Sequence, residues 1–342
     1  MTLRMECESM KEKHTFSRLD ALAGKLKEFQ NKGRILLIAH EKVDGDAVGS
    51  LFGAYCLLNE NGFDTVVLLP GEIPDMYKDF LPLSYRKEIT PEELAEFALV
   101  IFLDCANQKR CSVDFLKEGE IPLPVINIDH HPDNSAFGDW NYFDSTKAAT
   151  CEVLYFLAQE AGFTLSAEAA SFLLLGIITD SGCFRYDNTV ASTLQAASAL
   201  MEKGADRRKI IEKCYLAKPE NLAMLESELL VEHLRKCADG SFAYAYMTPE
   251  LLEKYQVDLR NTEQVIECIR QLDKIRACAV IRKEKTCFKL SLRSKDPAIS
   301  VGRIARTLGG GGHEMAAGCS LYVAGIEEAV ALLLDAVKKE IL

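Results

Sequence analysis

Short apolar runs alternate with longer segments of helical periodicity in the first half of the chain. Four runs rich in aliphatic and β-branched residues have the pattern of strands buried on both faces of a parallel sheet. They lie at residues 34–39, 64–69, 98–103 and 124–128. Between the first two runs, residues 46–62 have helix-like apolar spacing and end in a glycine. Because strands alternate with helices, we predict an α/β fold with a doubly wound, mainly parallel sheet.

The pattern becomes mainly helical after about residue 145, and strand-like runs return after residue 239. Segments with helix-like spacing lie at residues 147–162, 167–180 and 227–240. Strand-like runs lie at residues 241–247, 277–283 and 287–294. We therefore expect an N-terminal domain over residues 1–215, a helical connector over residues 216–238 and a smaller α+β domain over residues 239–342.

Composition excludes several classes of protein. The chain has 342 residues, of which 48% are hydrophobic, and this is enough for a large core in two domains. Its first sixteen residues lack the apolar core of a signal peptide, and no uncharged stretch reaches the roughly 18 residues that a membrane span needs. We expect a globular, cytoplasmic protein with no membrane association. No obligatory protein partner is evident, and a homodimer stays open.

The twelve cysteines and the net charge of −11 further limit the kinds of protein and substrate that fit this chain. The cysteines are scattered and form no C-x-x-C pair, so we expect free thiols that act as small apolar side chains. A protein that tracks long nucleic acid usually carries a broad basic surface, which is not expected of an acidic chain. A nucleic-acid substrate should therefore be short.

Acidic residues and histidines follow several of the predicted strands at the point where each strand ends. The stretch "VINIDHHPDN" is one example, and another acid ends the apolar run at residues 172–179. Sites in open α/β sheets form beyond the carboxyl ends of the strands, so we expect these side chains to converge on one cleft. The residues are His40, Asp44, Asp46, Asp104, Asp129, His130, His131 and Asp180.

Each of these residues also has a purely structural explanation. Asp44 with Gly45 is typical of a turn, and Asp46 is a good N-cap for the next helix. A single histidine is more often a core or surface residue than a ligand. A purely structural explanation is less convincing for the whole set, because four of the six histidines in the chain fall in these stretches or in residues 309–318.

The residue types fit a pair of divalent cations. Two cations roughly 3.5 to 4 Å apart need several carboxylates, one of them bridging, and together they activate water and stabilise a leaving oxygen in phosphoryl transfer. Mixed Asp and His ligation favours manganese over magnesium, which prefers oxygen ligands and retains its waters. The set therefore predicts a two-manganese hydrolase centre.

Five stretches resemble, in order, the motifs of the DHH phosphoesterases. They are "HEKVDGDAVGS", "LDCA", "NIDHHPDN", "TDSGCFRYDNT" and, at residues 309–318, "GGGGHEMAAG". The last is similar to the glycine-rich signature of the DHH-associated C-terminal domain, so the resemblance covers nearly the whole chain. Val43 departs from the proline that the family commonly has at this place, but the change removes no ligand.

The resemblance implies a role for each residue of the set. The implied ligands are His40 and Asp44 for one manganese ion, Asp46, His130 and Asp180 for the second, and Asp104 as a bridge between them. It further implies that His131 faces the scissile phosphate, where it stabilises charge or assists proton transfer. Asp129 is expected to orient the histidines.

A basic stretch leads into four consecutive glycines near the C-terminus. From residue 276 to residue 306 there are nine Lys or Arg against two acids. Glycine N–H groups approach an anion closely, so the stretch predicts a clamp for a terminal phosphate and a base. A flexible turn and a solvated basic face explain the same residues about as well. The candidate substrate contacts are Arg185, Arg293, Gly310, Gly311, Gly312 and His313.

Within the family, this compact chain resembles the stand-alone bifunctional oligoribonucleases that also remove the 3′-phosphate from adenosine 3′,5′-bisphosphate (pAp). The resemblance implies a manganese-dependent phosphoesterase for pAp and for di- to penta-nucleotides of RNA or DNA, including linear dinucleotides such as pApA or pGpG. A cyclic-dinucleotide phosphodiesterase and a single-strand exonuclease are the alternatives within the family. A non-catalytic nucleotide-binding protein is the alternative from another class.

Overall fold

The computed structural model describes residues 13–71, 73–81, 84–262 and 265–341. The chain divides into two compact units, Met1–Tyr215 and Leu216–Leu342. Most of the stretch in which we found no signal peptide, and Cys7 within it, lie outside the described residues. The eleven cysteines that are described carry free thiols, as expected. Among the described helices, none is long and apolar enough to cross a membrane.

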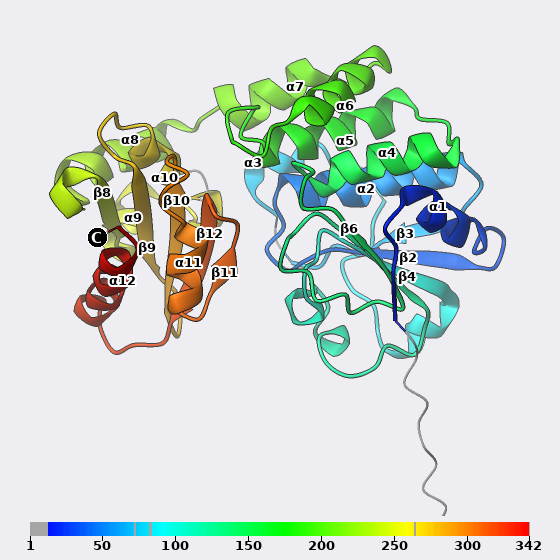
Figure 1. The fold of residues 1–342 in the computed structure, drawn as a ribbon, viewed down its shortest axis with the longest axis horizontal. Helices are drawn as coiled ribbons and strands as arrows, with labels where there is room; N and C mark the ends of the chain where they lie inside the picture. The colour runs from blue at the N-terminus through cyan, green and yellow to red at the C-terminus, as the bar shows by residue number, and fades with distance from the viewer. Residues whose placement is uncertain (1–12, 72, 82–83, 263–264, 342) are drawn as a thin grey trace, which may run out of the picture. The chain divides into compact units, whose positions relative to one another are not determined.

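A six-stranded parallel sheet forms the centre of the first unit, as predicted (Figure 1). Its order is β1-β6-β5-β4-β2-β3, and every neighbouring pair is parallel. The bounds are β1 (His14–Thr15), β2 (Arg34–Ile38), β3 (Thr65–Val67), β4 (Phe97–Leu103), β5 (Val125–Asp129) and β6 (Trp140–Phe143). The four predicted strands are present, and the sequence analysis did not predict β1 and β6.

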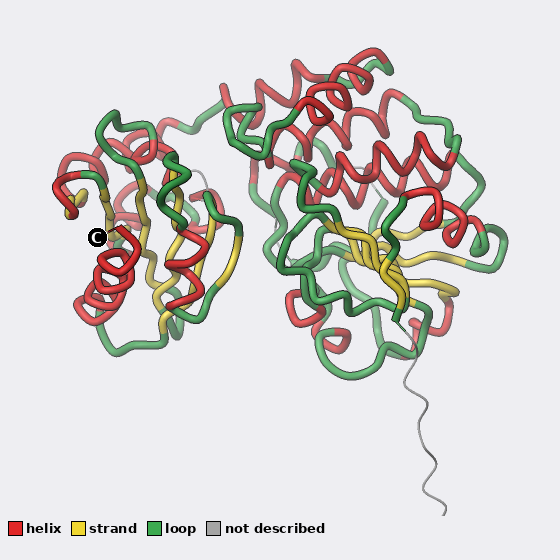
Figure 2. Tube along the Cα trace, in the orientation of Figure 1, coloured by secondary structure: helices red, strands yellow, loops and turns green. Residues whose placement is uncertain are grey.

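Seven helices of the first unit lie within the described residues, most of them packed on one face of this sheet (Figure 2). Their bounds are α1 (Leu19–Lys27), α2 (Gly45–Glu60), α3 (Asp75–Lys78), α4 (Thr150–Ala161), α5 (Ala167–Asp180), α6 (Ala191–Glu202) and α7 (Arg207–Ile211). Helix α2 contacts β2, β3 and β4 on one side and α4 and α5 on the other. This position buries it almost all round and explains its apolar sequence.

Both faces of the parallel sheet are buried, which explains its continuous apolar strands. Ile35 and Leu37 of β2 pack in the cluster that includes the long helices, whereas Leu36 and Ile38 pack in a cluster on the other face. Short 3-10 turns contribute to this second cluster in place of long helices. The turns Glu92–Glu96 and Asp114–Leu116 contribute Leu94 and Leu116, whereas a third turn, Gln108–Arg110, buries no residue.

Glycines allow helices α2 and α5 to cross closely. Gly45, Gly49 and Gly53 are spaced four residues apart and so share one face of α2. A Cβ atom on Gly49 would lie 2.6 Å from the carbonyl oxygen of Phe172 in α5. A Cβ atom on Gly176 of α5 would lie 2.4 Å from Oδ1 of Asp46. The close crossing therefore brings the middle of α5 directly against an acid of the predicted site.

The second unit contains a separate mixed sheet, as expected for an α+β domain. Its order is β11-β12-β10-β9-β8-β7, and β8 and β9 are its one parallel pair among the described strands. The strands are β7 (Leu234–Cys237), β8 (Phe242–Met247), β9 (Ala277–Lys283), β10 (Phe288–Ser294), β11 (Gly311–Gly312) and β12 (Ala316–Leu321). The helices are α8 (Glu220–Glu228), α9 (Pro249–Tyr255), α10 (Val265–Arg270), α11 (Val301–Thr307) and α12 (Ile326–Ile341).

The helix predicted over residues 227–240 is wrong in its second half. Helix α8 ends at Glu228, a π-helical turn follows over Leu229–His233, and Leu234 begins strand β7. This strand pairs antiparallel with β8, where Leu234 lies opposite Ala245. The apolar spacing fits a helix, but hydrogen bonds to the next strand along the chain decide the structure.

The close crossing of α2 and α5 generates a stability prediction. Gly49→Ala should lower the free energy of unfolding by about 1–3 kcal/mol, because the new methyl group forces the two helices apart. Gly24→Ala is the matched control, since a Cβ atom there meets nothing within 4 Å in the exposed middle of α1. The control should gain about 0.5–1 kcal/mol from helix propensity. Urea unfolding followed by circular dichroism measures both, and equal stability of the two variants would contradict the packing argument.

Candidate metal centre

The register of the parallel strands brings the predicted residues to one edge of the sheet. Ile38 of β2 pairs with Phe102 of β4. Two residues further along these strands stand His40 and Asp104, and Asp129 ends the neighbouring strand β5. All three side chains are buried. The convergence expected from the sequence is therefore present for these strands.

Asp104 lies between two groups of residues with metal-binding side chains. Its Oδ2 atom is 3.3 Å from Nε2 of His40, and its Oδ1 atom is 3.7 Å from Nε2 of His130. The backbone φ of Asp104 is +53°, a left-handed conformation that Asp tolerates better than most residues. The two oxygens of this one carboxylate thus face different histidines, which is the arrangement that a bridging ligand needs.

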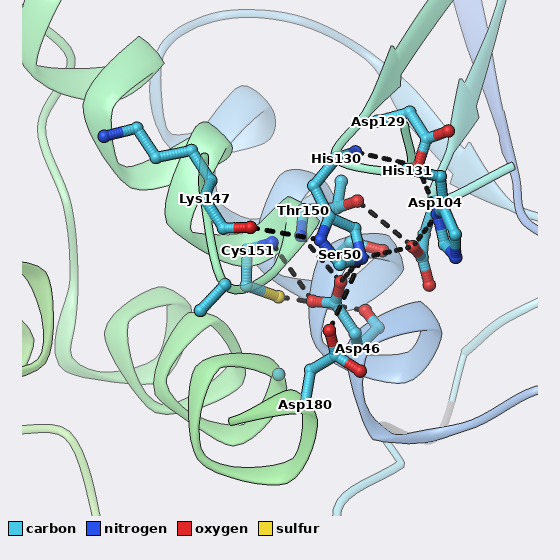
Figure 3. Close-up of polar contacts among 12 residues, drawn as sticks. Asp46, Ser50, Asp104, Asp129, His130, His131, Lys147, Thr150, Cys151 and Asp180 are labelled. Atoms are coloured by element: carbon cyan, nitrogen blue, oxygen red, sulfur yellow. Dashed lines mark hydrogen bonds and ion pairs between the residues drawn. The ribbon is translucent and has the colours of Figure 1, made fainter. Parts of the chain in front are cut away.

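Two groups that consist only of predicted ligands are close enough to hold a cation each. The potential ligand atoms of His40, Asp44 and Asp104 lie within 4.8 Å of one another, and so do those of Asp46, Asp104 and His130. Asp180, at the end of α5, brings its Oδ2 atom to 3.4 Å from Nε2 of His130 (Figure 3). These are the six residues predicted as ligands.

Burial and mutual charge effects together shift the titration of this cluster. Burial alone would lower the pKa of His40 and His130, but the neighbouring carboxylates raise both pKa values to about 9. Burial and the charge of Asp104 raise the pKa of Asp46 well above its usual range. Burial and neighbouring acids raise the pKa of Asp180 to about 6. Burial thus makes the charges of this cluster costly, and the histidines are the groups that offset the carboxylates.

The donor set fits divalent cations. Among the described residues, the ion pairs of these carboxylates are all with histidines and none is with Lys or Arg. Carboxylate oxygens and imidazole nitrogens together suit manganese, zinc or iron better than magnesium or calcium. Two cations would supply the positive charge that the cluster lacks.

Asp129 holds the second histidine of the triplet in one orientation. Its Oδ1 atom accepts hydrogen bonds from Nδ1 of His131 and from the backbone N–H of His130, both at 2.8 Å. Its Oδ2 atom accepts one from Nδ2 of Asn134 at 2.6 Å. Burial works to raise the pKa of Asp129, but the charge and hydrogen bond of His131 outweigh it and lower the pKa. With its Nδ1 atom protonated, His131 presents Nε2 as the reactive nitrogen.

The sequence analysis missed two polar residues that contact the site. Asn134 supports Asp129, and it also donates to Oδ1 of the buried Asn127 at 2.8 Å. Thr150 contacts Asp46 and Asp104 from the start of α4. Asn134 stands in the quoted stretch "VINIDHHPDN", so its proximity to the triplet was a usable signal. Thr150 had no such signal, because it is distant in sequence from both carboxylates.

The two arginines among the candidate substrate contacts have partners within their own units. Nε of Arg185 donates to the carbonyl oxygen of Gly182 at 2.6 Å, and its guanidinium lies 5.7 Å from the ring centre of Tyr215. Arg293 belongs to β10 in the second unit, where its Nε atom is 3.9 Å from Oε1 of Glu267. Among the described contacts within the first unit, Arg185 forms no hydrogen bond or ion pair with the predicted metal ligands.

The glycine run has a packing role in the second unit. Gly311 and Gly312 form β11, which pairs with β12. A Cβ atom on Gly310 would lie 2.2 Å from the carbonyl oxygen of Gly318. His313 follows in a tight turn, where its backbone N–H donates to the carbonyl oxygen of Ala316. Close backbone approach therefore accounts for Gly310 and Gly312, and phosphate binding stays a prediction.

Much of the charge in the predicted basic stretch is offset. Arg276 is 2.6 Å from Asp296, and Arg306 is 3.0 Å from Glu314. Arg303 forms a further ion pair with Glu340 of α12. Residues 276–306 are thus rich in Lys and Arg, but ion pairs offset part of their positive charge in the fold. This weakens the prediction of a phosphate clamp where it rests on charge alone.

Comparison with known proteins identifies the family. Residues 34–177 match the DHH family N-terminal domain, and residues 239–341 match the DHHA1 domain. The chain belongs to the DHH family. It is 30% identical to a Thermus thermophilus protein named bifunctional oligoribonuclease and PAP phosphatase NrnA, over 91% of each chain. A Bacillus subtilis protein of the same name is 29% identical, over 88% of this chain and 93% of its own. This DHH protein is accordingly a phosphoesterase hydrolase.

Two solved structures share the fold. An exopolyphosphatase-related protein from Bacteroides fragilis superposes with a TM-score of 0.83 at 24% identity, over 94% of this chain and 96% of its own. RecJ from Thermus thermophilus, solved in complex with Mn²⁺, gives a TM-score of 0.53 at 17% identity. That match covers 94% of this chain and 54% of RecJ. At these identities the likeness establishes the arrangement of the chain alone.

Substitutions of Asp104 and of His131 should affect metal binding and turnover differently. Asp104→Ala should abolish activity and lower bound manganese strongly, because it removes the group placed between both sets of ligands. His131→Ala should impair turnover with much less loss of metal. Asp114→Ala, which removes an exposed acid from a 3-10 turn, is the control and should change neither. Metal content by mass spectrometry and hydrolysis rates test the assignment, and equal depletion in the first two variants would contradict it.

Manganese binding should tighten as the pH rises from about 6 to about 9. The nitrogens of His40 and His130, with pKa values of about 9, must lose a proton before they bind a cation. Asp180, with a pKa of about 6, must do the same at lower pH. Calorimetric titration at several pH values, in two buffers of different ionisation enthalpy, measures both affinity and proton release. An affinity independent of pH, with no released protons, would contradict the titration argument.

Proposed function

We propose that this DHH protein is a manganese-dependent phosphoesterase that hydrolyses short oligonucleotides and pAp at a two-ion centre. The observation that carries the proposal is Asp104, whose two carboxylate oxygens face His40 on one side and His130 on the other. The names of the relatives in Thermus thermophilus and Bacillus subtilis supply the substrate classes. The shared carboxylate supplies the reason for two ions.

The six predicted ligands would divide between the ions. The first ion would take His40 and Asp44, the second would take Asp46, His130 and Asp180, and Asp104 would serve both. When bound, such a pair lowers the pKa of water and stabilises charge on the leaving oxygen. We favour manganese because the set mixes imidazole with carboxylate.

The residues of the chain itself orient the substrate and handle the proton. His131, held through Nδ1 by Asp129, would direct Nε2 at the phosphate. There it would stabilise developing charge or give a proton to the leaving oxygen. Asp129 would keep the imidazole in one tautomer, and Asn134 would keep Asp129 in place.

We assign the second unit to substrate binding. The proposed contacts are Arg293, Gly310, Gly311, Gly312 and His313, together with Arg185 of the first unit. The net charge of −11 gives long strands no extended track of positive charge, so affinity should not increase with length as it does for basic nucleic-acid binders. A cytoplasmic location stays a prediction, and a homodimer stays open.

A substrate panel tests the proposed function directly. With manganese present, the protein should hydrolyse pAp and 5′-phosphorylated dinucleotides, and it should act more slowly on oligomers of about 20 nucleotides, long enough to cover at least one single-strand site. Faster degradation of the long oligomers would favour a single-strand exonuclease. Turnover of cyclic dinucleotides in preference to linear ones would favour a cyclic-dinucleotide phosphodiesterase. Metal binding without turnover of any substrate would contradict the enzyme assignment.

His313→Ala should raise the KM for dinucleotides and leave the metal content unchanged. This is the pattern expected when a contact to the bound substrate is lost without damage to the metal ligands. His233→Ala, at another histidine of the second unit, is the matched control and should leave KM unchanged. Steady-state kinetics on a 5′-phosphorylated dinucleotide measures the effect. A variant that matches the parent would remove His313 from the proposed substrate contacts.

A further inference from the structure

Helix α4 begins against the predicted metal ligands, and an acid from another helix caps it. Its N-cap residue, Ala149, has no side chain that can accept a hydrogen bond. The backbone N–H of Thr150 donates instead to Oδ2 of Asp46 at 2.6 Å, and that of Cys151 donates to Oδ1 at 3.1 Å. The first N–H groups of a helix need such acceptors, and its dipole favours an anion there. Both oxygens of Asp46 are therefore held by the start of α4.

The hydroxyl group of Thr150 reaches a second carboxylate. Its Oγ1 atom donates to Oδ1 of Asp104 at 3.1 Å, and both residues are buried (Figure 3). This is the oxygen that faces His130, whereas Oδ2 faces His40. A donor on one oxygen fixes the rotation of the carboxylate about its last bond. Thr150 thus holds the carboxylate plane of Asp104 so that one oxygen faces each set of ligands.

A buried acid anchors the chain that leads into α4. Glu152 is fully buried, and its Oε2 atom accepts hydrogen bonds from the backbone N–H of Ala148 at 3.0 Å and from Oγ1 of Thr193 at 2.8 Å. Its Oε1 atom accepts one from Oγ of Ser192 at 2.7 Å. Thr193 and Ser192 belong to α6, so Glu152 ties the start of α4 to the next helical layer.

The anchored segment also orients a histidine. The carbonyl oxygen of Lys147 lies 3.3 Å from Nδ1 of His130. An imidazole that donates from Nδ1 presents Nε2 to a cation, and Nε2 is the atom that faces the carboxylates here. Residues 147–151 therefore contact three of the six predicted ligands, namely His130, Asp46 and Asp104.

We propose that Thr150 is a positioning residue that fixes Asp104 for metal binding, and that Glu152 with Ser192 anchors the segment that carries it. The proposal rests on the proposed function, because it assumes that these carboxylates bind cations. Partners of metal ligands commonly affect metal affinity or activity by 10- to 100-fold. Loss of the hydroxyl group should therefore weaken metal binding, although Thr150 contacts no ion itself.

The experiment compares variants of the full chain in Mn²⁺ titrations of metal-free protein by calorimetry. Thr150→Val keeps the shape and the backbone N–H bond to Asp46 and removes the hydroxyl group alone. It should raise the Kd for Mn²⁺ about 10- to 100-fold. Thr150→Ser keeps the donor and should bind Mn²⁺ like the parent. Thr65→Val is the matched control, because the buried hydroxyl group of Thr65 has no hydrogen-bond partner among the described residues.

A second arm tests the anchor without altering a fully buried residue. Ser192→Ala removes a donor to Glu152 at a half-buried position of α6, and it should weaken Mn²⁺ binding severalfold. The melting temperature of each metal-free variant checks the fold. If Thr150→Val does not fold, Ser192→Ala decides the outcome, since unchanged binding in it would overturn the anchoring role.

The other Mn²⁺ titrations distinguish the positioning role of Thr150 from general destabilisation and from failure of the proposed function. Unchanged Mn²⁺ affinity in folded Thr150→Val would overturn the positioning role, and so would an equal loss in Thr150→Ser. An equal loss in Thr65→Val would assign the effect to general destabilisation and would also overturn it. If the parent protein itself bound no Mn²⁺, the proposed function would fail instead, so the two failures are distinguishable.

Discussion

Repulsion among buried carboxylates is the constraint on which the rest of this site depends. Asp46, Asp104 and Asp129 are almost completely buried beside one another, and Asp180 adds a fourth negative charge. Buried charges are costly unless they are paired, and here the partners are histidines rather than Lys or Arg. Two cations would relieve this repulsion, and until they bind, the fold alone must keep the acids together.

Three parts of the fold hold the buried acids in place. The parallel strands β2, β4 and β5 end at one level and deliver His40, Asp104 and Asp129. Glycines let helices α2 and α5 cross closely, so that α5 packs against Asp46. The start of α4 supplies N–H donors to Asp46 and a hydroxyl group to Asp104. Asp46 and Asp104 are thus held beside each other by contacts that do not need a cation.

The sequence predicted the parts of the site that lie at strand ends and missed the parts that support them. His40, Asp104 and Asp129 follow apolar runs, and parallel strands bring such positions together. Thr150 is separated from Asp46 by 104 positions, so no local pattern connects them. Strand β7 was predicted as a helix for a different reason, because its apolar spacing fits a helix and does not reveal its pairing with the adjacent strand β8. The positive charge of residues 276–306 is partly offset in the fold, which the sequence did not indicate. Glu340 lies outside this stretch and forms an ion pair with Arg303.

The central claim is that Asp104 joins two cations in one centre. Electron paramagnetic resonance of the manganese-loaded protein tests it most directly, together with the number of ions bound per chain. The account predicts two Mn²⁺ per chain with the spectrum of an exchange-coupled pair, as expected for ions roughly 3.5 to 4 Å apart. A single bound ion, or two ions that show the spectrum of isolated Mn²⁺, would contradict it.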